Sequence, residues 1–126
     1  MNETINPDHI AVVLNRPRYP ENIGSAARAM KNMGFYRLVV VDPENLDLEK
    51  IKRLATHAAG DVVDGIRLFS NLQEALSSFR YVAGATARMG SQRQIVLPPW
   101  EMAGKLIPIS SENDVAIVFG SEDRGL

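Results

Sequence analysis

Asn22, Gly24 and Arg28 are the first residues whose types and spacing could do chemistry, because they fall at the start of an expected helix. A helix start has backbone N–H groups without intrahelical partners and a positive dipole end, and both attract anions. Six residues separate Asn22 from Arg28, so both side chains could face one side of the helix start. In the structural alternative, Asn22 caps the helix, Gly24 allows close packing on the sheet, and Arg28 is a solvated surface residue.

Two further segments place small and polar residues at the ends of expected strands. Residues 119–126 read Phe-Gly-Ser-Glu-Asp-Arg-Gly-Leu, so Gly120 and Gly125 flank the carboxylate of Glu122. Glycines permit positive φ angles and a close approach of the backbone to a ligand. Residues 84–88 read Gly-Ala-Thr-Ala-Arg, and their small side chains could cradle a flat ligand. Taken alone, each segment is equally compatible with an ordinary turn.

The hydrophobic pattern predicts the elements that would position these segments. Compact apolar runs indicate strands, and apolar residues spaced by three and four indicate helices. The expected strands cover residues 9–14, 37–41, 66–69, 81–85 and 114–119; the expected helices cover residues 23–33, 48–59, 72–79 and 98–106, and residues 86–97 form a loop. We expect Gly34 to cap the first helix, Gly60 to close the second, and Asn71 with Glu74 to form a capping box at the third.

Strands that alternate with helices predict an α/β fold. Right-handed crossovers then give a mostly parallel sheet with helices on both faces. Ligands of such sheets bind beyond the carboxyl ends of the strands. The loops after Leu14, Ala85 and Phe119 are therefore the expected site.

The composition excludes several classes of function. The chain has 126 residues, 45% of them hydrophobic and 23% charged, which is typical of one soluble globular domain spanning residues 1–126. With no cysteine and only two histidines, we expect no metal cofactor. The chain starts with polar residues, and its longest aliphatic run is residues 38–41, so we expect a cytoplasmic protein without a membrane segment.

The distribution of charge is more informative than the net charge of −1. Basic residues crowd the first third of the chain: Arg16, Arg18, Arg28, Lys31 and Arg37. Acidic residues follow them: Asp42, Glu44, Asp47 and Glu49. The first group could form a local patch for RNA phosphates. The alternative is a solvated surface of mixed charge.

Together, the three segments resemble the motifs of one enzyme family. Asn22, Gly24 and Arg28 with residues 29–34, then residues 84–88, then residues 118–126, are similar to the first motif, middle loop and second motif of the TrmJ-type branch of the TrmH family. These are SPOUT-class RNA 2′-O-methyltransferases. The order and spacing match across essentially the whole chain, and the combination is far more specific than any one segment.

The resemblance implies a SPOUT fold with a deep trefoil knot near its C-terminus, and a homodimer with the active site between subunits. It implies transfer of a methyl group from S-adenosylmethionine to a ribose 2′-hydroxyl of tRNA or another structured RNA, in the anticodon loop for the closest branch. By position, the catalytic residues would be Asn22, Arg28 and Glu122, the cofactor-binding residues Ala85, Thr86, Ala87 and Gly120, and the RNA-binding residues Arg16, Arg18, Arg28 and Arg88.

These residue types fit the implied reaction. A protonated ribose hydroxyl is a poor nucleophile, so a catalyst must orient it, help to remove its proton and hold the neighbouring phosphate. A guanidinium normally stays charged, so phosphate clamping is the expected role of Arg28. Methyl donation from a sulfonium needs no metal.

The family's third motif is missing from the sequence, because in the family it follows the position of Leu126. We therefore expect a chain truncated at its C-terminus, with an incomplete knot and cofactor pocket and weaker self-association. The alternative is a non-catalytic module of the same fold that binds RNA or a protein. An unrelated flavodoxin-like nucleotide binder is disfavoured, since no Gly-x-Gly-x-x-Gly or Gly-Lys-Ser/Thr loop follows any expected strand.

Overall fold

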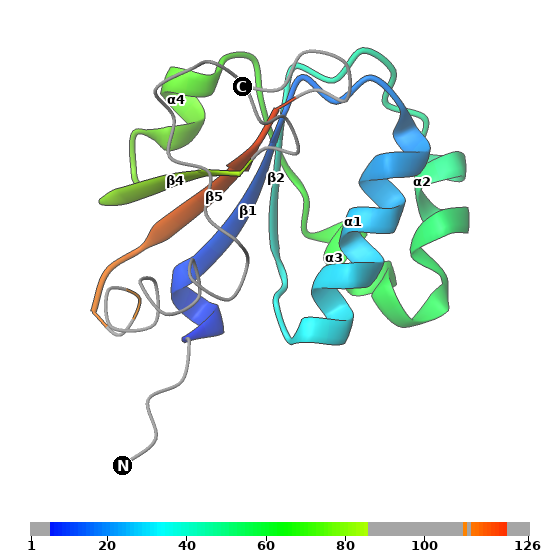
Figure 1. The fold of residues 1–126 in the computed structure, drawn as a ribbon. Helices are drawn as coiled ribbons and strands as arrows, with labels where there is room; N and C mark the ends of the chain where they lie inside the picture. Colours follow the sequence, from blue (N-terminus) through cyan, green and yellow to red (C-terminus); the bar gives the residue numbers. More distant parts are fainter. Residues whose placement is uncertain (1–5, 86–109, 111, 121–126) are drawn as a thin grey trace.

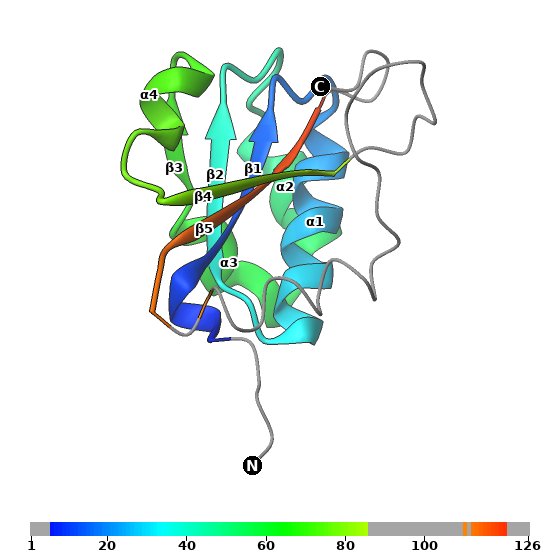
Figure 2. The same ribbon diagram turned by 60° about the vertical axis from the view of Figure 1, so that its left-hand side comes forward.

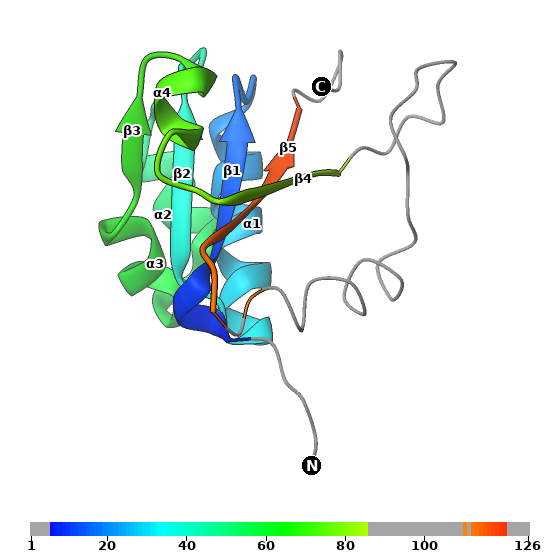
Figure 3. The same cartoon turned by 90° about the vertical axis from the view of Figure 1, so that its left-hand side faces the viewer.

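Five parallel strands form the sheet in a computed structural model that describes residues 6–85, 110 and 112–120. The strands are β1 (Ile10–Asn15), β2 (Arg37–Val41), β3 (Arg67–Phe69), β4 (Tyr81–Ala85) and β5 (Val115–Phe119). Their order across the sheet is β3-β2-β1-β5-β4, most of which is visible in Figure 3. Every neighbouring pair is parallel, which confirms the predicted α/β architecture.

Helices cover both faces of the sheet, as the alternating pattern predicts. The helices are α1 (Pro20–Met33), α2 (Leu48–Ala55), α3 (Gly60–Asp64) and α4 (Leu72–Leu76), with short 3₁₀ turns η1 (Pro7–His9) and η2 (His57–Ala59). Figure 1 shows α1, α2 and α3 on one side of the strands and α4 on the other. In the part of the chain that the structure describes, no helix has the length and apolar character to cross a membrane.

Alternate residues of the central strands enter two separate cores. Val12, Leu38 and Val40 pack with apolar residues of α1, α2 and α3. Val13 and Val39 point to the other face and pack with Ala75 of α4 and with β5. Each aliphatic side chain buried in this way contributes roughly 1.5–3 kcal/mol of transfer free energy. The strands are therefore apolar on both faces, as expected for a covered parallel sheet.

Helix α1 begins three residues earlier than predicted. Pro20 occupies its first turn, where a missing N–H costs nothing and the fixed φ angle suits a helix. The N-cap is Tyr19, which makes no side-chain capping bond, so Asn22 lies inside the helix and does not cap it. At the other end Gly34 has φ 86° and its N–H donates to the Lys31 carbonyl, which confirms the predicted cap.

The predicted helix over residues 48–59 is confirmed only as far as Ala55, where α2 ends. Thr56 has φ 65° and ψ 175°, a conformation that cannot continue a helix. After η2, Gly60 adopts helical angles and starts α3, so it does not close the helix as expected. Apolar spacing of three and four continues across such a break, which is why periodicity alone does not detect it.

Helix α4 is shorter than predicted, since it ends at Leu76. The Ser77 hydroxyl donates to the Glu74 carbonyl at 2.8 Å and competes with a continued helix. The Asn71 side chain accepts a hydrogen bond from the Glu74 N–H at 2.7 Å, so half of the predicted capping box is present. The expected loop over residues 86–97 and helix over residues 98–106 lie outside the described residues.

Candidate functional site

The carboxyl ends of β1, β5 and β4 lie side by side, and the loops that follow them are the predicted place for a ligand. Phe119 is the register partner of Leu14 on one side and of Ala85 on the other. In Figure 2 the strands β1 and β2 point toward one edge of the sheet, which β5 also approaches. From β1 the chain continues to β2, which lies on one side of β1. On the other side of β1 lies β5, which the chain reaches from β4. The strand order therefore reverses between β1 and β5, and this boundary is a topological switch point. Ligands of open parallel sheets bind at such points.

Two residues just beyond these strand ends have a strained backbone. Arg16 follows β1 with φ 55°, and Asp42 follows β2 with φ 43°. The Arg16 N–H donates to the Val41 carbonyl at 2.7 Å, and the Asp42 N–H donates to the Phe69 carbonyl at 2.9 Å. These bonds hold left-handed conformations that cost of order 1–3 kcal/mol each and that cluster at functional sites. Aspartate adopts positive φ angles more often than most residues, whereas arginine gives no such indication in the sequence.

The predicted RNA-binding residues Arg16 and Arg18 lie beside acidic partners. The Arg16 Nε is 3.7 Å from an Asp42 carboxylate oxygen, and the Arg18 Nε is 3.6 Å from one of Glu44. All four side chains are about half exposed or more, so each pair contributes about 1 kcal/mol or less. The surface around these two arginines is thus of mixed charge.

The structure does not bring Asn22 and Arg28 to one side of α1. A helix turns about 100° per residue, so a six-residue separation leaves the two side chains about 120° apart around the axis and about 9 Å apart along it. Both residues are exposed. Among the described residues, no hydrogen bond or ion pair holds the Arg28 side chain, so its guanidinium is available to a ligand.

Gly24 packs against helix α2 and not against the sheet, contrary to our structural alternative. A Cβ atom at this position would lie 2.2 Å from the Ile51 carbonyl oxygen and 2.9 Å from the Leu54 Cβ. Only glycine allows this close approach of the two helices. Gly24 thereby fixes the position of α1, and with it the position of Arg28.

The two described members of the predicted cofactor site lie on neighbouring strands. Ala85 ends β4 and Gly120 follows β5, and the Ala85–Phe119 register places both at the switch-point edge. Gly120 has no side chain and Ala85 has only a methyl group, so these residue types would allow a ligand to approach the backbone closely. Thr86, Ala87, Arg88 and Glu122 lie outside the described residues. Within the described part, no three His, Cys, Asp or Glu side chains gather as a metal site would require.

Comparison with known proteins identifies close sequence relatives. The chain is 40% identical over 118 residues to a protein named uncharacterized tRNA/rRNA methyltransferase LasT from Escherichia coli, covering 93% of this chain and 51% of that protein. It is 41% identical over 120 residues to the tRNA (cytidine/uridine/adenosine-2′-O-)-methyltransferase TrmJ of Pseudomonas aeruginosa, covering 94% and 46%. The chain therefore spans about half the length of the curated relatives it matches.

Solved structures agree with this relationship. A probable methylase family protein from Haemophilus influenzae superimposes with a TM-score of 0.83 at 35% identity, covering 96% of this chain and 50% of that one. TrmJ from Z. mobilis superimposes with a TM-score of 0.81 at 33% identity, covering 92% and 51%. The profile of the SpoU rRNA Methylase family matches residues 9–126. Because that match covers nearly the whole chain, the chain belongs to the SpoU rRNA methylase family.

Proposed function

We propose that this chain carries the methyl-transfer site of an S-adenosylmethionine-dependent RNA 2′-O-methyltransferase that acts on tRNA. The observation that carries the proposal is the meeting of Ala85, Gly120 and the loop that leads into α1 at one edge of the sheet, in a member of the SpoU family. The names of the TrmJ relatives, which specify tRNA 2′-O-methylation, support the substrate and the reaction.

Each motif residue has a role that its chemistry permits. Arg28 clamps the phosphate beside the target ribose, since its guanidinium is exposed and without a carboxylate partner among the described residues. Asn22 and Glu122 orient the ribose hydroxyl, and Glu122 helps to accept its proton. Arg16, Arg18 and Arg88 contact further phosphates. When bound, S-adenosylmethionine supplies an electrophilic methyl group.

The cofactor lies at the switch-point edge, held by residues 85–87 and Gly120. Backbone groups of Ala85 and Gly120 would bind it, because neither residue has a large side chain. We also place the target ribose on the β1 side of this edge. The loop between β1 and α1 follows the carboxyl end of β1 on that side.

The complete protein would act as a homodimer in the cytoplasm, on the anticodon loop of tRNA. A homodimer is what the resemblance to the TrmJ-type enzymes implies. Light scattering of the full-length protein over a concentration series tests the assembly. A monomer at every concentration would rule it out.

Calorimetry with two cofactors tests the proposed site. The full-length protein should bind S-adenosylmethionine and should not bind flavin mononucleotide, the ligand expected of a flavodoxin-like protein. Gly120→Leu places a bulky side chain at the switch-point edge and should abolish binding without changing the circular dichroism spectrum. Flavin binding in place of S-adenosylmethionine binding would reject the proposal, as would normal cofactor affinity in Gly120→Leu.

A further inference from the structure

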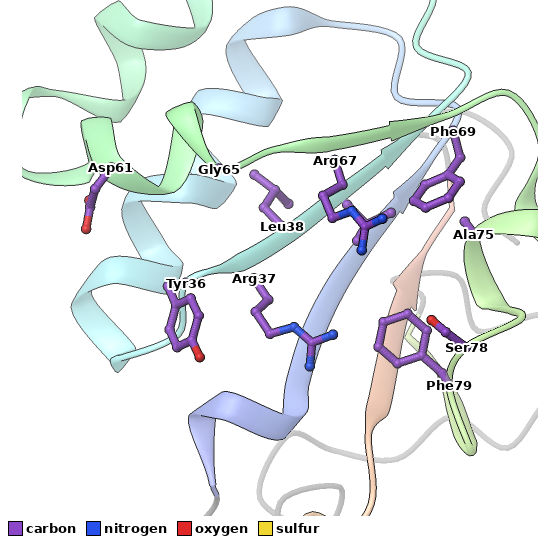
Figure 4. Close-up of a pocket in the computed structure, with 11 residues that line it drawn as sticks. Tyr36, Arg37, Leu38, Asp61, Gly65, Arg67, Phe69, Ala75, Ser78 and Phe79 are labelled. Carbon is purple, nitrogen blue, oxygen red and sulfur yellow. The ribbon is translucent and has the colours of Figure 1, made fainter.

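A groove of about 330 Å³ opens on the α4 side of the sheet, away from the candidate site. Its lining includes Arg37, Val39, Arg67, Phe69, Ser78 and Phe79 (Figure 4). Arg37 and Arg67 are the first residues of β2 and β3, so the groove begins at the amino ends of these strands. The groove reaches Phe69, the register partner of Val41 at the end of β2, whereas the proposed transfer site lies at the ends of β1, β5 and β4.

The strand register places both arginines on the same face of the sheet. Val39 pairs with Arg67, and Val39 packs with the residues of α4. Since alternate residues of a strand share a face, Arg37 and Phe69 also project toward the α4 side. Figure 4 shows the two guanidinium groups reaching toward the phenylalanine rings. Each arginine lies over a ring: the Arg37 Cζ is 5.4 Å from the Phe79 centroid, and the Arg67 Cζ is 5.5 Å from the Phe69 centroid.

The two arginines differ in how far their charge is compensated. The Arg37 Nη1 donates to the Asp114 carboxylate at 3.2 Å and to the Asp8 carbonyl at 2.9 Å, and its side chain is only 28% exposed. Arg67 is exposed and, in the described part of the chain, has no carboxylate within ion-pair distance. Arg37 is therefore a fixed part of the wall, whereas Arg67 is free to bind an anion.

The acid nearest the groove is already neutralised. Asp61 lines its far end, and the Lys31 Nζ donates to the Asp61 carboxylate at 2.8 Å. This hydrogen bond lowers the pKa of Asp61, which stays ionised and paired with Lys31. Tyr36, also in the wall, donates its hydroxyl to the Asp8 carboxylate at 2.6 Å, and this bond raises the pKa of the phenol.

An apolar floor with stacked arginine and phenylalanine side chains fits a nucleotide. Arginine binds phosphate through two parallel hydrogen bonds, and unpaired bases stack on aromatic rings and on guanidinium planes. The volume lies at the low end of the range for small-ligand pockets, about 300–1,000 Å³, so it suits one nucleotide. We propose that this groove binds one unpaired nucleotide of the RNA substrate, with its phosphate on Arg67 and its base against the Arg37–Phe79 stack.

This assignment rests on the proposed function only in naming RNA as the ligand. The groove is a second anchoring site, distinct from the edge at which the methyl group is transferred. The groove should therefore strengthen RNA binding and leave cofactor binding unchanged.

The test measures binding of a fluorescent single-stranded RNA to the full-length protein over a series of salt concentrations. Arg67→Glu should raise the Kd about fivefold or more and reduce the salt slope, by roughly 0.7 for each phosphate that the variant no longer binds. Phe79→Leu keeps an apolar side chain but removes the ring, and should raise the Kd with the salt slope unchanged. Arg53→Glu is the matched control, because Arg53 is exposed on α2, on the other side of the sheet.

The outcomes separate this proposal from the proposed function. If Arg67→Glu and Arg53→Glu bind RNA equally well while methyl transfer continues, the groove is not an RNA site and the enzyme assignment stands. If Arg67→Glu weakens RNA binding, Arg53→Glu does not, and the wild-type protein transfers no methyl group, then the groove is an RNA site and the enzyme assignment is wrong. A wild-type protein that binds no RNA overturns both.

Discussion

Arg28 is exposed on α1 without an ion-pair partner among the described residues, which is the state expected of a residue that binds a phosphate of the substrate. Arg28→Ala should lower methyl transfer on the order of a hundredfold, since a contact made in the transition state contributes about 2–4 kcal/mol. Folding and cofactor affinity should stay close to wild type. Steady-state kinetics and calorimetry measure both effects, with Arg53→Ala as the control. Wild-type turnover in Arg28→Ala would refute the role.

Gly24 is the motif residue whose role the structure explains most directly. Gly24→Ala forces a Cβ atom to within 2.2 Å of the Ile51 carbonyl, a backbone atom that cannot rotate away. Overpacking of this kind costs typically 1–3 kcal/mol, and a backbone clash lies at the upper end. Urea denaturation should therefore show a clear loss of stability.

Gly60→Ala provides the matched control. Its added Cβ would meet no atom within 4 Å, and Gly60 already has the helical angles φ −60° and ψ −34°. This substitution should be neutral or stabilise by about 0.4–1 kcal/mol. Equal stability of the Gly24→Ala and Gly60→Ala variants would mean that the two helices do not approach as closely as described.

At the scale of elements, the break between α2 and η2 depends on Thr56. Its φ of 65° and ψ of 175° fall in a region that is nearly exclusive to glycine and costs a β-branched residue about 1–3 kcal/mol. Thr56→Gly should relieve this strain and raise the free energy of unfolding by roughly 1 kcal/mol, after the extra chain entropy of glycine is subtracted. Thr56→Ala keeps the strain, so a denaturation curve in which alanine stabilises as much as glycine would contradict the geometry.

The strands could be predicted from the sequence more reliably than the helix ends. A buried parallel strand appears in the sequence as a short apolar run, such as residues 38–41. Helix ends depend instead on single residues. Pro20 starts α1 before the first apolar residue of the helix pattern. Thr56 ends α2, although the apolar spacing continues beyond it. Both effects depend on backbone angles, which hydrophobic spacing does not encode.

At the scale of the whole molecule, the site depends on which strands become neighbours. The sequence indicates that Leu14, Ala85 and Phe119 end strands, and a general rule places ligands there. It contains no signal that Val39 pairs with Arg67, which is the register that creates the groove between β2, β3 and α4. Features within one segment could thus be predicted, whereas features that join distant segments required the structure.

The switch-point edge should support methyl transfer to a ribose 2′-hydroxyl. The most direct measurement incubates the full-length protein with radiolabelled S-adenosylmethionine and unmodified tRNA, and then locates the label by nuclease digestion and mass spectrometry. We predict a single 2′-O-methylated nucleotide in the anticodon loop, and no labelling when that nucleotide is replaced by its 2′-deoxy form. A methyl group on a base, or undiminished labelling of the 2′-deoxy tRNA, would rule out 2′-O-methyl transfer by this protein.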